Sequence, residues 1–327
     1  MTSVERAARR LDRAQQRSPA AGFAFAVVKK FGDDRGSALA AQLAYYGFMA
    51  LFPLLLVLTT ILAFVVNSTV EDNVIATTLK QFPVLGQQIG REASHPLTGS
   101  AVGLVIGVLG LLYGSLGLAQ AAQHAMAQVW NVPGVVRPVF LPRLARSVLF
   151  FTVAGVAMAL ATGLSGAATL AGRGVVWRLV FLLGAVALDV GVYLAAFRVL
   201  TPADVATGDL VVGAVLGGVG YSLLLMVGTG LVQHQLRHAQ AVYGQFAFVL
   251  GLMSWLYLVA ELSLYAAEVN VVRGRRLWPR SIVQPPLTDA DQHVLRDITR
   301  AEERRPEPRV DVGFEPSAVP EPPHPEA

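Results

Sequence analysis

The sequence predicts an all-α polytopic membrane protein, a bundle of about six transmembrane helices with both termini on the cytoplasmic side. Apolar residues make up 54% of the 327 residues and charged residues only 15%. The mean hydropathy is +0.53. A chain of this composition needs lipid as its solvent. The other two observations are the length of the apolar runs and the placement of the basic residues between them.

A helix needs about 20 residues to cross the roughly 30 Å hydrocarbon core of a membrane. Six runs meet this length: 37–66, 99–119, 147–171, 176–198, 210–232 and 246–270. Together they define a transmembrane domain over residues 37–272. Pro53 should kink the first helix, because proline removes a backbone donor and clashes with the preceding turn. The second helix should continue past the lipid to about residue 129.

The basic residues set the orientation. Residues 1–36 form a basic N-terminal arm, and most of the remaining arginines fall on the same side of a six-span topology. They include Arg137, Arg143, Arg146 and a cluster after the sixth run. Lysine and arginine accumulate in cytoplasmic connections, so the arm and the C-terminus are both expected inside the cell. The long connection 67–98 is then expected outside.

Residues 273–327 are rich in proline and charge. Such a composition buries too little apolar surface to offset the entropy lost on ordering. This segment is therefore predicted to be a disordered cytoplasmic tail.

Three acids lie in the predicted spans: Asp189, Glu261 and Glu268. A charge inside the bilayer is costly, so each should face a partner, a cavity or a proton. Tyr257 and Tyr265 lie four residues on either side of Glu261 and give the sixth helix one polar stripe. The acids are either functional or simply paired within the bundle. For Glu268, pairing with the arginines that follow the span is the simpler interpretation.

The inner end of the second helix carries a polar face that includes Gln120, Gln123 and His124. A face this long suits an aqueous vestibule, and Tyr45 of the first helix is a further candidate for its lining. An interfacial helix end is the alternative. In the fifth helix, Gly213 and Gly217 have the spacing that allows close helix packing within a bundle.

Several kinds of chemistry find no support in the motifs. The chain has no cysteine, and it contains no phosphate-binding loop, nucleotide fingerprint or metalloprotease motif. We expect no cofactor, no metal site and no catalytic residues.

Four segments together resemble the YihY/BrkB family of bacterial inner-membrane proteins. They are Ala40–Leu56 with its Tyr45-Tyr46 and Phe52-Pro53 pairs, Trp130-Asn131-Val132, Phe197–Pro202, and Tyr243–Asn270. The chain departs from the family pattern at Ala266, where glycine is frequent, and at Glu261, where the family is usually apolar. The resemblance implies a multi-pass protein of the plasma membrane with a suggested role in moving lipids or solutes. The family has also carried the label ribonuclease BN, which these residues do not support, because the inner connections offer no metal cluster or basic-aromatic RNA surface.

The leading functional hypothesis is a transporter or lipid-translocating protein of unknown substrate. Its expected partners are the lipid bilayer and a lipid or small molecule, with no nucleic acid, and a homo-oligomer is left open. The alternative is a non-transporting membrane scaffold or regulator of envelope machinery. The first predicts a polar cavity reaching Asp189 or Glu261, and the second predicts that these acids are paired in a sealed core.

Overall fold

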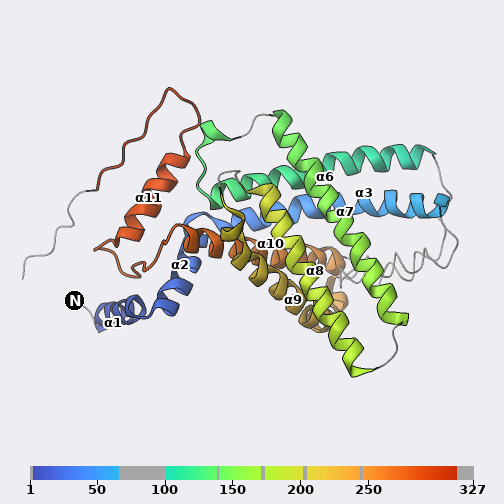
Figure 1. The fold of residues 1–327 in the computed structure, drawn as a ribbon, viewed down its shortest axis with the longest axis horizontal. Coiled ribbons are helices and arrows are strands. Elements are labelled where there is room, and N and C mark those ends of the chain that lie inside the picture. The colour runs from blue at the N-terminus through green and yellow to red at the C-terminus, as the bar shows by residue number, and fades with distance from the viewer. Residues whose placement is uncertain are drawn as a thin grey trace, which may run out of the picture.

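A computed structural model of the chain describes residues 3–65, 101–137, 140–170, 174–201, 205–243 and 246–314. Within these residues the fold is helical throughout, which confirms the predicted all-α class (Figure 1). The elements are α1 (Ser3–Arg17), α2 (Pro19–Asp33), α3 (Gly36–Val65), α6 (Ala101–Val129), η1 (Gly134–Val136), α7 (Phe140–Leu170), α8 (Val175–Leu200), α9 (Thr207–Tyr243), α10 (Phe246–Gly274) and α11 (Asp289–Ala301).

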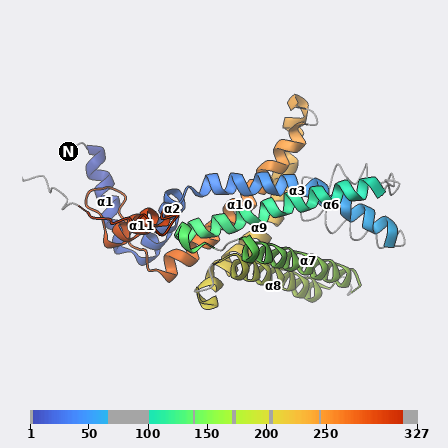
Figure 2. The same cartoon turned by 90° about the horizontal axis from the view of Figure 1, so that it is seen from above.

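The long helices pack in pairs that extend from one end of the molecule. α3 packs against α6 and α10, α10 against α9, α9 against α8, and α8 against α7. Figure 2 shows the α3–α6 pair and the α7–α8 pair as separate layers, while α1, α2 and α11 gather at one end of the long helices. We call that end, which also holds η1, the basic end of the bundle.

Four helices of the described chain are long and apolar enough to cross a membrane: Leu141–Ala161, Val175–Leu200, Thr207–Gly228 and Val249–Gly274. They correspond to the last four predicted runs. α3 and α6 cover the first two, and α3 continues through Pro53 as one helix. The predicted outer connection 67–98 lies outside the described residues.

The surface of α7 and α8 shows that this composition serves contact with lipid. None of the most apolar stretch of α8 is buried within the protein. Large apolar side chains such as Trp177, Leu183 and Leu160 are exposed along both helices. A continuous exposed apolar surface of this kind marks a lipid interface.

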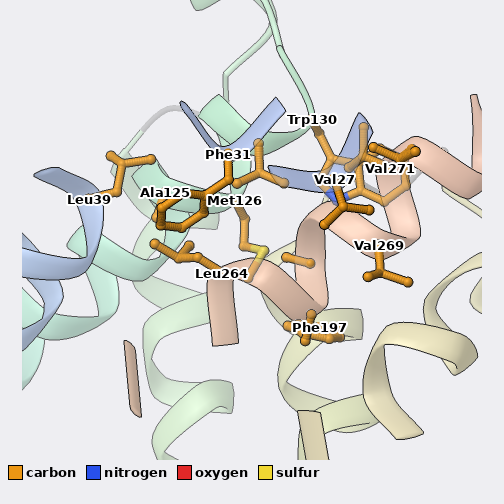
Figure 3. Packing of buried hydrophobic residues seen from close by; sticks show 14 of the residues in the cluster. Val27, Phe31, Leu39, Ala125, Met126, Trp130, Phe197, Leu264, Val269 and Val271 are labelled. Atoms are coloured by element: carbon orange, nitrogen blue, oxygen red, sulfur yellow. The ribbon is translucent and has the colours of Figure 1, made fainter. Parts of the chain in front are cut away.

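The apolar core is concentrated at the basic end (Figure 3). Val27 and Phe31 of α2 meet Met126 and Trp130 at the end of α6, together with several residues of α10. The Phe31 ring stacks on Tyr265, with centroids 3.9 Å apart. The basic N-terminal arm predicted from the sequence therefore contains a helix, α2, that packs into the core. Ser18 caps α2, and Pro19 occupies its first turn, where no backbone donor is needed.

The C-terminal segment differs from the disordered tail expected over 273–327. Thr288 and Asp291 form a reciprocal capping box at the start of α11, and Val294 is fully buried in the core. The overall composition of the segment is proline-rich and charged and does not predict this helix. The capping box and one buried apolar face nevertheless order it. Residues 315–327 lie outside the described part of the chain.

The glycines of α9 allow close approach of neighbouring helices, as the sequence analysis predicted. The Gly213 amide donates to Asn270 Oδ1 at 2.7 Å, and a methyl group at Gly213 would overlap the carbonyl oxygen of Ala266 in α10. A methyl group at Gly218 would overlap the backbone of Val190 in α8. These glycines place α9 between α8 and α10.

We predict that Gly213→Ala lowers the stability of the folded protein by about 1–3 kcal/mol, the usual cost of overpacking a close contact. Gly191→Ala in α8 is the matched control, since nothing lies within 4 Å of its added methyl group. Thermal unfolding in detergent, followed by size-exclusion chromatography, measures both. Equal melting of the two variants would show that the α9–α10 contact tolerates a side chain.

Candidate functional site

A cavity of about 820 Å³ lies at the basic end of the bundle. Its wall is formed by α3, the last turns of α6, the η1 connection, the start of α7, the end of α8 and the segment after α10. The polar residues that line it are Gln42, Tyr46, Gln120, Gln123, His124, Asn131, Arg137, Arg143, Arg146 and Arg275. We refer to it as the arginine cavity.

The end of α6 positions the first of these arginines. Asn131 adopts a left-handed conformation with φ 47°, and the Val132 amide donates back to the Ala127 carbonyl at 2.8 Å. Asparagine tolerates this conformation better than most residues, so it ends the helix and turns the chain. The turn returns Arg137 to the side of α6.

The Arg137 guanidinium is held by three neutral acceptors. It donates to Gln128 Oε1 at 2.8 Å, to His124 Nδ1 at 3.2 Å and to the Val132 carbonyl at 3.3 Å. His124 accepts this bond, so its Nδ1 carries no proton. Burial lowers the pKa of His124, and the charges of Arg137 and Arg143 lower it further, so the imidazole is neutral near pH 7.

The charged side chains that line the cavity are four arginines, with no acid among the lining residues. Arg275 forms an ion pair with Asp297 at 2.9 Å and donates to the Trp130 carbonyl at 2.8 Å. Burial lowers the pKa of Arg137; Arg304 and Arg143 also lower it, whereas Glu302 raises it. The arginines thus lie close enough to disfavour one another's charge.

Of the residues proposed from the sequence as cavity lining, Gln120, Gln123 and His124 line the arginine cavity, whereas Tyr45, Tyr257 and Tyr265 do not. The neighbour of Tyr45, Tyr46, does line it. Gln123 also joins α6 to α7 by donating to Ser147 Oγ at 3.1 Å.

The three candidate acids lie at different places. Asp189 accepts a hydrogen bond of 2.6 Å from Ser222 Oγ, between α8 and α9. Glu261 is partly buried on α10. Glu268 is fully buried. None of the three lines the arginine cavity, so this cavity is not the polar cavity reaching Asp189 or Glu261 that the transport hypothesis predicts.

Glu268 pairs with a residue that the sequence analysis did not consider. The Lys30 ammonium of α2 lies 3.8 Å from the Glu268 carboxylate. Lys30, rather than an arginine after the span, is therefore the cation nearest to Glu268 among the ion pairs of the described residues. Lys30 also donates to Asp34 and, at 3.1 Å, to the Val129 carbonyl of α6. Asn131 donates to Asp34 at 3.2 Å. The four-residue spacing of Lys30 and Asp34 was the only sequence signal of this cluster.

This cluster holds one lysine and two acids, all buried. Burial raises the pKa of Asp34, and the nearby Lys30 opposes that rise. The Glu268 and Asp34 carboxyl groups also lie within hydrogen-bond reach of each other, and this contact lowers the pKa of Asp34. Lys30 therefore balances one of the two acids fully and the other only at a distance.

A second buried network fixes the C-terminal segment. Asp291 accepts from Lys29 and from Arg280, each at 2.8 Å, and from the amide and hydroxyl of Ser281. Burial alone would raise the pKa of Asp291, but its hydrogen bonds from Lys29, Ser281 and Thr288 hold it well below the usual range. Arg280 also pairs with Asp33 of α2 at 2.7 Å.

The docked C-terminal segment reaches the wall of the cavity. The Val135 amide of η1 donates to the Glu303 carbonyl at 2.9 Å, and Asp297 of α11 pairs with Arg275. Residues 297–303 therefore contact two segments that line the cavity, the η1 connection and the segment after α10.

Comparison with known proteins identifies one family. The family model described as virulence factor BrkB matches residues 27–286. This match confirms the resemblance inferred from the sequence and spans every helix from α3 to α10. No curated protein and no solved structure shows significant similarity to the chain.

We predict that Asp291→Asn releases α11 from α2, because the charged acceptor of Lys29 and Arg280 is lost. Hydrogen exchange of the α11 amides and limited proteolysis near residue 285 should both accelerate, while Asp311→Asn, at an exposed position, should change neither. The lowered pKa of Asp291 also fixes a pH window: its stabilisation is complete above about pH 4 and is lost as the pH falls toward the folded-state pKa. Unchanged α11 protection in Asp291→Asn would contradict this role.

We predict opposite outcomes for two changes in the Lys30 cluster. Lys30→Met leaves two buried acids without their cation and should cost about 3–5 kcal/mol of stability. Glu268→Gln leaves the balanced Lys30–Asp34 pair and should be close to neutral. Thermal unfolding in detergent measures both variants. A severe loss in Glu268→Gln would show that the glutamate charge is itself required.

Proposed function

This chain belongs to the virulence factor BrkB family, and from that premise we propose that it moves a lipid or a small solute across the bacterial plasma membrane. That it is an integral membrane protein follows from the family and from its long apolar helices.

The proposed topology has six spans with both termini in the cytoplasm. In support, the basic side chains that the positive-inside rule assigns to the cytoplasm are gathered at a single end of the bundle. Lys29 and Arg280 lie there in the α11 network, and Arg137 and Arg143 lie there in the cavity wall. The basic end then faces the cytoplasm, and the paired helices extend from it into the lipid.

One observation carries the proposed activity: the arginine cavity itself. It is an open concavity in which side chains from six segments of the chain converge. Its volume of about 820 Å³ lies among polar and apolar side chains, and this size is typical of sites that hold small organic ligands. Helices from both layers contribute to the wall, so a relative movement of the layers would change access to it.

The intramembrane acids remain candidates for the path beyond the cavity. Asp189 and its partner Ser222 lie in the layer of α8 and α9, and Glu261 lies on α10. Because an acid at this depth is costly, each is proposed to serve a polar route through the bundle. The arginine cavity reaches neither, so the proposal places it at the cytoplasmic mouth of that route.

A non-transporting scaffold or regulator is the alternative function. The docking of α11 favours it, because this helix is held in place and exposes Leu295 and Arg296 outward, where a partner protein could bind. Catalysis, a cofactor and nucleic-acid binding form no part of either proposal, and a homo-oligomer is compatible with both.

We predict that filling the cavity slows transport. Gln120→Trp places a large ring in the cavity, whereas Leu109→Trp places the same ring on an exposed apolar position of the same helix. Purified protein in vesicles should accelerate movement of a fluorescent phospholipid between leaflets, or leakage of a charged small solute. Gln120→Trp should reduce that rate at least several-fold and Leu109→Trp should not. If no movement depends on the protein, the scaffold function gains the support that transport loses.

A further inference from the structure

The arginine side chains of the cavity converge from separate parts of the chain. Arg137 comes from the connection after α6, Arg143 and Arg146 come from the first two turns of α7, and Arg275 directly follows α10. No short sequence motif brings these four together. The fold alone gathers them around one space that holds no acid in its lining. We propose that the arginine cavity is a binding site for a phosphate-bearing anion, an inference that rests on the proposed transport function and names the substrate class of its site.

The placement of Arg143 and Arg146 supports this assignment. The N-terminus of a helix carries a partial positive charge, which favours acids in the first turn and disfavours bases. α7 has no acid in its first turn and has Arg143 there instead. Arg146 lies three residues on, on the same face. An anion in the cavity would interact favourably with the helix dipole and with both guanidinium groups.

The hydrogen bonds of Arg137 prepare it for the same role. Its three partners, Gln128, His124 and the Val132 carbonyl, fix the direction of the guanidinium without cancelling its charge. A guanidinium oriented in advance binds oxyanions well, because its planar fork matches two oxygens of one group. Several such forks around one space suit a phosphate, whose unesterified oxygens can be shared among them.

The size of the cavity and its surroundings bear on the source of the phosphate. A volume of about 820 Å³ exceeds what inorganic phosphate fills and suits a phosphate ester with an organic body. Exposed apolar side chains accompany the arginines in sequence: Leu141 is 74% and Val148 60% exposed, and Val136, which also lines the cavity, is 69% exposed. A phospholipid headgroup or a soluble phosphate ester supplies the same chemistry, and basic pockets between membrane helices on the cytoplasmic side bind lipid headgroups.

The experiment measures binding to the full-length protein in nanodiscs of phosphatidylcholine. One arm adds phosphatidylglycerol and follows bound lipid by native mass spectrometry. The other arm adds glycerol 3-phosphate and follows binding by calorimetry. The variants are Arg143→Gln with Arg146→Gln, and separately Arg137→Gln. The matched control is Arg198→Gln, an exposed arginine at the end of α8 outside the cavity lining. Circular dichroism on each variant verifies the fold.

We expect one arm to bind, with affinity at least about tenfold weaker in both cavity variants, the equivalent of one lost charged contact, and unchanged in Arg198→Gln. Binding in the phosphatidylglycerol arm alone identifies the lipid headgroup, and binding in the glycerol 3-phosphate arm identifies a soluble ester. Either result supports the site. Equal weakening in Arg198→Gln, or no binding in both arms, overturns it.

The outcome is separable from that of the proposed function. Cavity-dependent binding without any transport would leave the anion site standing and refute the transporter. Transport that is slowed by Gln120→Trp but indifferent to both arginine variants would retain the transporter and refute the anion site.

Discussion

The buried ammonium of Lys30 joins more of this structure than any other single group that we describe. It belongs to α2 and donates hydrogen bonds to Asp34, in the turn before α3, and to the last carbonyl of α6. It also forms an ion pair with Glu268 of α10. Three helices, α2, α6 and α10, and the turn between α2 and α3 therefore meet at one cation. A buried ion pair adds little net stability compared with a hydrophobic contact, because desolvation offsets its attraction. Loss of Lys30 would leave buried charge uncompensated, so its contacts favour this arrangement of the helices.

The geometry of the arginine cavity follows from this junction. Asn131 lines the cavity and donates to Asp34, so the turn that carries Arg137 back toward α6 is fixed by the same cluster. Phe31 and Trp130 pack around it in the core. Beyond the basic end the helices extend as separate layers (Figure 2). Buried polar contacts are thus concentrated at the basic end, and exposed apolar side chains lie along α7 and α8.

Much of the architecture could be predicted because it depends on local properties of the chain. The spans follow from length and hydropathy, the packing of α9 from Gly213, and the polar face of α6 from the spacing of Gln120, Gln123 and His124. The two buried networks could not be predicted in the same way. Lys30 and Glu268 are far apart in sequence, and neither has a local feature that names its partner. Asp291 looks like an ordinary charge in a proline-rich segment, and only the fold supplies Lys29 and Arg280 as donors.

The docked C-terminal segment has an energetic connection with the cavity. Arg275 lines the cavity and at the same time pairs with Asp297 of α11. A guanidinium has a limited number of donors, so an anion that draws Arg275 inward competes with Asp297 for them. The η1 connection is subject to the same constraint, because Val135 is held by Glu303 while the neighbouring Val136 lines the cavity. Coupling between two binding events is reciprocal. If an anion in the cavity weakens the Arg275–Asp297 pair, it raises the free energy of docking α11 by a coupling free energy. Release of α11 then strengthens anion binding by that same coupling free energy.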